Sequence, residues 1–245
     1  AKGFSIGFGK ELSEYIRGNI VYNFEHVEVL DVLDTAPQFI RDQQGKRLSS
    51  SLSPSLIRDT RDSLIDPTRG SRNAIYTTFA GIGGDNYFIK ALLDSGWYIP
   101  LVWDTTLGLR GRVGYASGFA GKELPVYERF YVGGIDTVRG LGFGEAGPRG
   151  AAGEKIGGTK KVIFNTEFIF PIVKDLRLKG VAFFDAGRAY DKNEQIKIQD
   201  LRPTTGLGIR WISPLGLIRV EWGYNLSRKP DEDQSRWEFA IGAAF

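Results

Sequence analysis

The chain ends in Arg236-Trp237-Glu238-Phe239-Ala240-Ile241-Gly242-Ala243-Ala244-Phe245, and most alternate residues of this stretch are aromatic or aliphatic. The positions between them carry Arg236, Glu238 and small residues. A period of two places successive side chains on opposite sides of an extended chain. We therefore predict a strand at residues 235–245, with one apolar face and one face that is charged or small.

The same alternation runs backwards through the chain. From Ile218 to Leu226, apolar residues alternate with Arg219, Glu221 and smaller polar residues, and from 162 to 170 they alternate with a set that includes Glu167. Turn residues divide the whole chain into about eleven predicted strands. These span residues 1–12, 15–33, 47–61, 71–83, 86–99, 102–117, 161–171, 176–190, 203–213, 216–226 and 235–245.

Strand length separates the two all-β classes that fit this pattern. A soluble β-sandwich also alternates, but its strands usually have about 5 or 6 residues, whereas membrane strands need about 9 to 11. Several predicted strands reach the longer length, and aromatic residues gather where strands end, as in the girdles of membrane barrels. These aromatic residues are Trp97, Tyr98, Trp103, Trp211, Trp222, Trp237 and Phe245. The prediction is an all-β fold, a transmembrane antiparallel β-barrel.

Composition removes most other classes of protein. The chain has no cysteine and one histidine, His26, which argues against disulfide scaffolds, zinc sites and thiol or histidine catalysis. Basic residues are scattered and the formal charge is only +3, so no nucleic-acid partner is expected. We predict no enzyme activity, no cofactor and no metal site.

Three features that imitate functional sites are given structural readings. Gly142-Phe143-Gly144-Glu145-Ala146-Gly147 has dinucleotide-binding spacing, but no recognisable helix follows it. His26 has Glu25 and Glu28 beside it in sequence, yet neighbouring strand residues point to opposite faces. Asp231-Glu232-Asp233 is read as a solvated acidic run in an outer loop.

The connections suggest which end of each strand faces which side of the membrane. Short turns alternate with longer links, the pattern of barrels that have tight periplasmic turns and extended external loops. The longest link runs from about Gly118 to Lys160. An odd strand number conflicts with the even number of bacterial barrels, so further strands are expected before residue 1.

Four blocks resemble the Omp85 superfamily, and specifically its assembly-factor branch. They are the long-link block Arg129 to Leu141, Asp59-Thr60-Arg61-Asp62 leading to Pro67-Thr68-Arg69-Gly70, Phe183-Phe184-Asp185-Ala186-Gly187, and Trp211-Ile212-Ser213-Pro214-Leu215-Gly216 with the terminal strand. The likeness covers residues 47–245 in register, while residues 1–46 fit by strand pattern alone. The loop motif usually ends in an aromatic residue, where this chain has Leu141.

The resemblance implies a partial barrel, with about 11 strands out of a total of 16, from which the N-terminal strands and the periplasmic POTRA domains are absent. It implies a bacterial outer-membrane protein that folds and inserts β-barrel proteins through a laterally opening seam. The implied partners are outer-membrane lipids, unfolded β-barrel substrates and periplasmic accessory lipoproteins. A polypeptide secretion transporter of the same superfamily, or a passive porin, is the alternative.

The resemblance also implies that the long loop folds back into the lumen. Its motif is Val138, Arg139, Gly140 and Leu141. A partly desolvated guanidinium needs partners, and Glu167 and Asp185 lie on strand faces assigned inward by their alternation. Because arginine binds carboxylates through paired hydrogen bonds, we predict that Arg139 pins the loop to the inner wall through these two residues.

The last strand carries two further hypotheses. Gly242 removes a side chain near the edge, which weakens strand pairing and makes it a candidate hinge of the seam. Trp237, Phe239, Ile241 and Phe245 resemble the C-terminal signal by which barrel substrates are recognised. The plainer reading of these side chains is contact with lipid, and the two roles are compatible.

Overall fold

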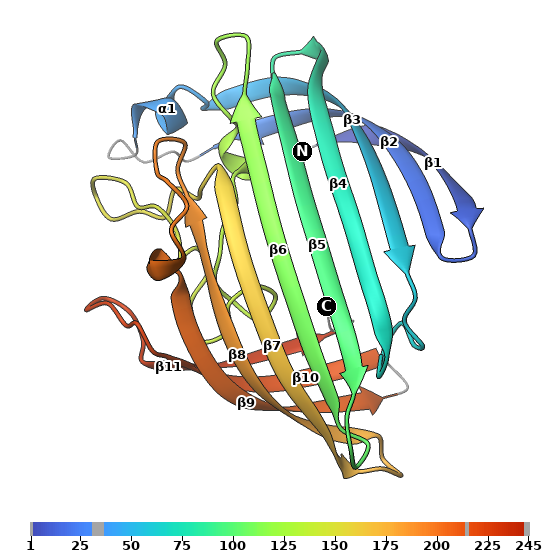
Figure 1. Cartoon of the computed structure of the whole chain (residues 1–245). Helices are drawn as coiled ribbons and strands as arrows, with labels where there is room; N and C mark the ends of the chain where they lie inside the picture. The colour runs from blue at the N-terminus through green and yellow to red at the C-terminus, as the bar shows by residue number, and fades with distance from the viewer. Residues whose placement is uncertain (1, 31–36, 214–215, 243–245) are drawn as a thin grey trace.

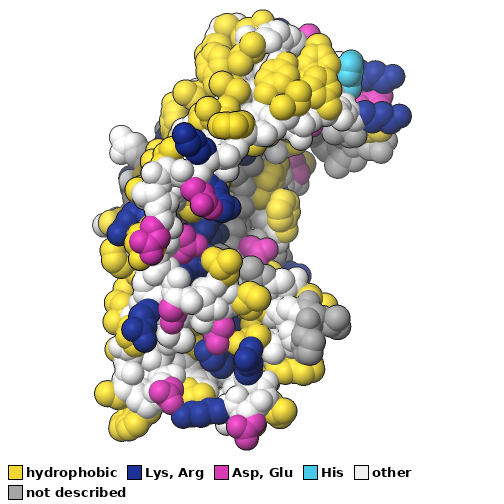
Figure 2. Space-filling view, turned by 90° about the vertical axis from the view of Figure 1, so that its right-hand side faces the viewer, with side chains coloured by type: hydrophobic (Ala, Val, Ile, Leu, Met, Phe, Trp, Pro, Cys, Tyr) yellow, Lys and Arg dark blue, Asp and Glu magenta, His cyan; other side chains and the backbone are white. Residues whose placement is uncertain are grey.

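The computed structural model describes residues 2–30, 37–213 and 216–242, and within them the chain forms one antiparallel sheet whose strands follow the order of the sequence (Figure 1). The sheet curves around a hollow, which Figure 2 shows from the side. The strands are β1 (Lys2–Ser13), β2 (Ile16–Val29), β3 (Gly45–Asp59), β4 (Gly70–Gly84), β5 (Phe88–Pro100), β6 (Thr106–Gly118), β7 (Lys160–Val173), β8 (Leu178–Tyr190), β9 (Arg202–Ser213), β10 (Gly216–Asn225) and β11 (Ser235–Ile241).

In the part of the chain that the structure describes, helix occurs only in the connections between strands. A single turn, α1 (Gln38–Arg41), lies between β2 and β3, and two short 3-10 segments, η1 (Val126–Glu128) and η2 (Ile198–Asp200), lie in later links. No helix in the ranges that the structure describes is long and apolar enough to cross a membrane.

The period of two separates an apolar outer face from a polar inner face. In β7, Phe164 is 48% exposed on the outside, whereas Glu167 has no exposed surface on the inside. Large apolar side chains stay exposed along the outer faces of neighbouring strands, which forms an apolar surface much larger than a water-soluble monomer tolerates. Such a surface suits hydrocarbon, and the predicted transmembrane β-fold is confirmed.

Two aromatic residues assigned to the girdles lie elsewhere. Tyr98 is only 7% exposed and faces the interior, because its neighbour Trp97 takes the outward position of β5. Trp222 lies inside β10 and not at its end. The centre of its ring is 6.0 Å from that of Tyr224. Trp97, Trp103 and Trp237 are exposed, as a girdle requires.

The strand boundaries differ at two places that matter. The strand predicted at 15–33 ends at Val29, and residues 31–36 lie outside the described part. The strand predicted at 235–245 ends at Ile241, and the next residue, Gly242, has a φ of +137°. Phe245 lies outside the described residues, as do Ala243 and Ala244.

Candidate functional site

The connection between β6 and β7, residues 119–159, folds into the hollow of the sheet, and we call it the inner loop. A bridge between Phe130 and Gly158 joins two segments of this loop. Six apolar side chains of the loop are buried and pack against residues of the inner wall. Those of the loop are Leu124, Phe130, Val132, Val138, Leu141 and Ala146, and those of the wall are Ala80, Phe88, Ala116, Ile163 and Ala189. The loop therefore forms a small core inside the sheet.

A tight turn aims the tip of the inner loop at the wall. Gly133 and Gly134 have φ values of +132° and +103°, in the region that favours glycine. The amide of Gly133 donates to Thr137 Oγ1 at 2.8 Å, and the amide of Gly134 donates to the carbonyl of Val138 at 3.1 Å. The turn presents Val138 and Arg139 to the wall.

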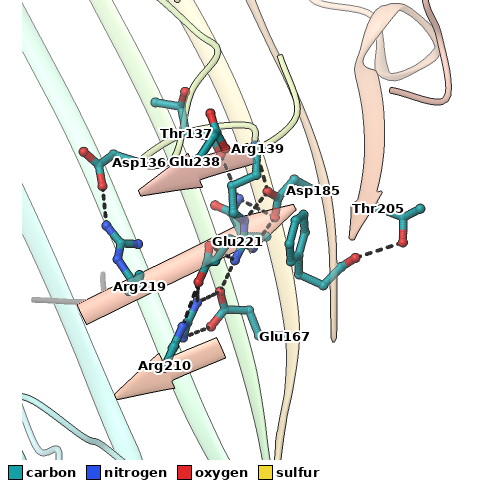
Figure 3. A network of polar contacts seen from close by, with 12 residues as sticks. Asp136, Thr137, Arg139, Glu167, Asp185, Thr205, Arg210, Arg219, Glu221 and Glu238 are labelled. Carbon is teal, nitrogen blue, oxygen red and sulfur yellow. Dashed lines mark hydrogen bonds and ion pairs between the residues drawn. The ribbon is translucent and has the colours of Figure 1, made fainter. Parts of the chain in front are cut away.

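Arg139 lies at the centre of a buried charge network, in which it is 2% exposed (Figure 3). Its Nε and Nη2 donate to the two carboxylate oxygens of Asp185, both at 2.7 Å, in the paired geometry that arginine favours. Its Nη1 donates to Glu167 Oε1 at 2.6 Å and to Glu221 Oε2 at 3.1 Å. The guanidinium carbon also lies 3.7 Å from the ring centre of Phe183.

A second arginine, Arg210, completes the network. Its Nη1 and Nη2 donate to Glu167 at 2.8 and 2.6 Å, and its Nε donates to Glu221 Oε1 at 2.9 Å. Three carboxylates with no exposed surface thus face two guanidinium groups. The carboxylates share the arginine donors, so that each buried charge has an opposite charge beside it. This pairing is needed because an unpaired buried charge strongly destabilises a fold.

The network joins consecutive strands to the loop. Glu167 comes from β7, Asp185 from β8, Arg210 from β9 and Glu221 from β10. By contrast, the side chains described for β11 reach the loop motif through one long bond, from the amide of Gly140 to Glu238 Oε2 at 3.3 Å. We call the four-strand arrangement around Arg139 the arginine clamp, and the edge strand β11 lies outside it.

Flanking contacts hold the turn on both sides of Arg139. Asn165 donates to Asp185 Oδ1 and to the carbonyl of Thr137, both at 2.8 Å. Arg112 donates to the carbonyl of Asp136 at 2.6 Å, and Arg219 donates to Asp136 Oδ1 at 2.8 Å. The position of the turn is therefore fixed from β6, β7 and β10 together.

Glycines in the wall make room for the loop motif. A Cβ atom on Gly223 of β10 would lie 2.5 Å from the amide nitrogen of Gly140, and one on Gly140 would lie 2.7 Å from the carbonyl carbon of Gly223. A Cβ atom on Gly187 of β8 would lie 2.9 Å from Val138 Cγ2. The backbones of loop and wall touch here, and larger residues would separate them.

The structure brings Arg139 together with Glu167 and Asp185, two carboxylates that sequence reasoning selected as its partners. Arg210 and Glu221 were not selected, although the inward parity of Glu221 was visible in the alternation of residues 218–226. Leu141, which departs from the aromatic residue usual at this position, is fully buried in the small core of the loop.

The other sequence candidates lie apart from the clamp. Trp237, Phe239 and Ile241 are exposed on the outer face of β11. Gly242 follows the strand, and its amide still donates to the carbonyl of Leu217 at 2.8 Å. The backbone pairing of β11 with β10 therefore continues as far as Gly242.

The features that imitated functional sites take structural positions. Gly142 to Gly147 form a turn in which the amide of Gly142 donates to Glu145 Oε2 at 2.6 Å. His26 packs beside Phe24 on β2, with 6.3 Å between ring centres. Within the described ranges, no group of three or more histidine, cysteine or acidic residues is arranged to hold a metal ion.

The reading of Glu232 as a solvated residue is wrong, because this side chain is buried and centres a second polar cluster. Arg202 donates to its two oxygens at 3.1 and 2.6 Å, and Asn225 donates at 3.1 Å. Arg149 of the inner loop reaches it at 3.4 Å. The cluster fastens the link between β10 and β11, residues 226–234, to the inner loop.

Acid is expected to release this link. Burial, the largest single influence, raises the pKa of Glu232, but hydrogen bonds and charge from Arg202, with the amide of Lys229, outweigh it and lower the pKa to about 2. A lowered pKa stabilises the fold above the ordinary value of 4.5, and this stabilisation is lost as the pH falls towards 2. A spin label at Pro230 should gain mobility over this range, whereas Glu232→Gln should be mobile at every pH. Equal, pH-independent mobility in both proteins would contradict the assignment.

Comparison with known proteins identifies the family. A model described as the Omp85 superfamily domain matches residues 1–245. The "Outer membrane protein assembly factor BamA" of Nitratidesulfovibrio vulgaris is 35% identical over 99% of this chain and 32% of its own length. That of Neisseria meningitidis serogroup B is 31% identical over 99% of this chain and 36% of its own length. The chain thus spans about a third of these relatives, whose names are those of assembly factors and not of enzymes.

One further relative matches about half of the chain, and a solved structure matches its fold. The "Sorting and assembly machinery component 50 homolog" of Xenopus tropicalis is 34% identical over 51% of this chain and 26% of its own length. A crystal structure of BamA from Haemophilus ducreyi lacking POTRA domains 1–3 superposes with a TM-score of 0.86 at 20% identity, over 99% of this chain and 54% of that one. The family and its bacterial members assign the chain to the outer membrane. An apolar-faced antiparallel sheet, a loop clamped inside it and a family match along the whole chain lead to one conclusion: the chain belongs to the Omp85 superfamily.

Proposed function

We propose that this chain is part of a factor that folds and inserts β-barrel proteins into the outer membrane. The observation that carries the proposal is the arginine clamp, which ties β7 to β10 into one unit and leaves β11 outside it. A rigid wall next to a loosely held edge strand suits a protein that works by strand pairing. The names of the bacterial relatives agree with this role.

The proposed mechanism needs no catalytic group. An exposed strand edge offers a row of backbone donors and acceptors on which an incoming strand can pair. Within the described residues, the pairing between β10 and β11 runs from Ile218–Ile241 to Tyr224–Ser235, and the amide of Gly242 adds one further bond, to Leu217. In this mechanism β11, as the last strand, moves aside from the first strand of the complete barrel, Gly242 serves as the hinge, and the clamp keeps the wall in register.

The proposed partners follow from the two faces of the sheet. Outer-membrane lipids contact the outward side chains, among which Trp237, Phe239 and Ile241 also fit the proposed recognition signal of the terminal strand. Unfolded β-barrel proteins are the substrates. Periplasmic accessory lipoproteins are further proposed partners. We also propose that the complete protein has sixteen strands and POTRA domains.

A passive porin is a weaker candidate because the inner loop and its small core occupy the hollow of the sheet. A secretion transporter of the same superfamily would share this architecture, so an experiment is needed to distinguish it from an assembly factor.

Depletion of the full-length gene product tests the proposal. We expect outer-membrane β-barrel proteins as a class to decline together, while lipoproteins of the same membrane keep their levels, because only the barrels need strand-by-strand insertion. The measurement is quantitative proteomics of isolated outer membranes, with a plasmid copy of the gene as the control that restores the levels. Loss of one secreted protein with unchanged barrels would favour the transporter instead.

A further inference from the structure

The outer surface of β1 to β4 contains a groove of about 480 Å³ that the clamp and the proposed mechanism do not use. Its walls are apolar side chains from four neighbouring strands, among them Phe8, Leu12, Ile20, Leu56 and Ile75. Hydrophobic side chains cover most of the outer surface at the top of Figure 2, the side of the molecule on which these strands lie.

The strand register explains why the surface is hollow at this place. Lys10 pairs with Gly18 across β1 and β2, and Gly18 pairs with Leu56 across β2 and β3. Gly18 contributes no side chain to this outward row, so a gap remains between Lys10 and Leu56. A Cβ atom on Gly18 would be in ordinary contact with Leu12, 3.4 Å from its Cδ1. The next row, Phe8 to Ile20 to Pro54, closes the groove on one side.

Two cations lie at the same end of this surface. Lys10 belongs to the lining of the groove, and Arg58 lies on the outward face of β3 two residues beyond Leu56, opposite Ile16. Both side chains are exposed, and neither has a hydrogen bond or ion pair with any residue in the described ranges. On the opposite face of the same strands, Arg17 is paired with Glu11 at 2.8 Å.

The two cations are placed so that both can reach one anion in the headgroup region. They lie near the short turn between β1 and β2, where these membrane strands end, and long cationic side chains extend from such positions towards the headgroup region. Adjacent strands are about 4.8 Å apart, so the backbones of β1 and β3 lie about 10 Å apart. Two extended side chains can meet over this distance at a single anion.

We propose that the groove binds an anionic phospholipid. One acyl chain lies over Gly18 between the side chains of Phe8, Leu12, Ile20 and Leu56, and its phosphate is held by Lys10 and Arg58. The apolar walls account for the acyl chain, and the two cations, which have no partner among the described residues, account for the negative headgroup. Zwitterionic lipid fills the same hydrocarbon space but has no net charge for the cations to attract.

Native mass spectrometry of the purified full-length protein tests this site. Delipidated protein is titrated with phosphatidylglycerol or with phosphatidylcholine of the same acyl chains, and the retained lipid is counted. We expect phosphatidylglycerol to be retained preferentially and Lys10→Ser and Arg58→Ser each to reduce its retention about fivefold, the effect typical of one basic residue at an anionic membrane surface. Arg17→Ser, a change on the opposite face of β2, is the matched control and should retain lipid as the original protein does.

Filling the groove gives an independent arm. Gly18→Leu should lower the retention of both lipids because it occupies the space of the acyl chain, and Gly18→Ala, which fits without a clash, should lower it less. Heat-modifiable migration in gels reports whether each variant is folded, and Gly18→Ala keeps the test open if Gly18→Leu does not fold. Equal retention of the two lipids, an unchanged double variant of Lys10 and Arg58, or complete displacement of lipid by inorganic phosphate would each overturn the proposal.

Discussion

Replacing Arg139 by glutamate is expected to release the inner loop from the wall and to abolish growth of a strain that depends on the gene. In the native network, two guanidinium groups face three buried carboxylates, Glu167, Asp185 and Glu221. The variant would place a fourth carboxylate there and leave only Arg210 opposite. Removing one partner of a buried pair costs about 3–5 kcal/mol, and reversing its charge adds repulsion.

Two measurements test whether the inner loop is released and whether function is lost. Complementation of a depleted strain reports function, and trypsin cleavage at Arg149 or Lys155 reports whether the inner loop has left the wall. Arg139→Lys should have an intermediate effect, because it keeps the charge but loses the paired hydrogen bonds to Asp185. Arg17→Glu, at an exposed ion pair, is the control and should complement fully. Full complementation and an uncleaved loop in Arg139→Glu would disprove the role of the clamp.

Replacing Gly223 by alanine should have the second largest effect, although it adds one methyl group and no charge. The new carbon would lie 2.5 Å from the amide nitrogen of Gly140, closer than real contacts allow. It cannot rotate away, because the backbone fixes the position of a Cβ atom and the atoms that it meets are backbone. Overpacking costs about 1–3 kcal/mol, and this rigid contact should reach the upper end of that range.

The matched control is Gly96→Ala, in which the added carbon has no neighbour closer than 3.8 Å. We expect Gly223→Ala to increase trypsin cleavage of the inner loop and to lower the urea concentration at which the barrel unfolds, while Gly96→Ala changes neither. Identical behaviour of the two alanine variants would show that the loop does not need close contact with β10.

The positions of the strands could be predicted from the sequence because the two faces of each strand lie in different environments. The outer face meets apolar lipid, and the inner face meets a polar space. The parity of residues 162–170 and 218–226 placed Glu167 and Glu221 inward, as observed. Tyr98 was misplaced because the girdle was read from residue type, although the parity of β5 puts it opposite to Trp97. The face on which a side chain lies can be predicted from the alternation within a single strand, with no information from the rest of the chain.

The clamp was only partly predictable for a different reason. A buried arginine in a long loop requires carboxylates, and Asp185 and Glu167 were the acidic residues found on nearby inward faces. Which further groups meet them depends on the curvature of the sheet and on the register between β9 and β10, which pairs Arg219 with Arg210 and Glu221 with Gly208. The apolar core of the loop was missed because residues such as Leu124 and Val132 follow no period.

The separation of the clamp residues along the chain has a consequence for how this protein itself matures. Arg139 lies 28 residues from Glu167, 46 from Asp185 and 82 from Glu221. Because Glu221 belongs to β10, the last contact of the clamp cannot form until that strand has reached the membrane. A copy interrupted before β10 would hold Arg139 through Glu167 and Asp185 alone, so complete closure of the clamp reports that β7 to β10 have all been delivered.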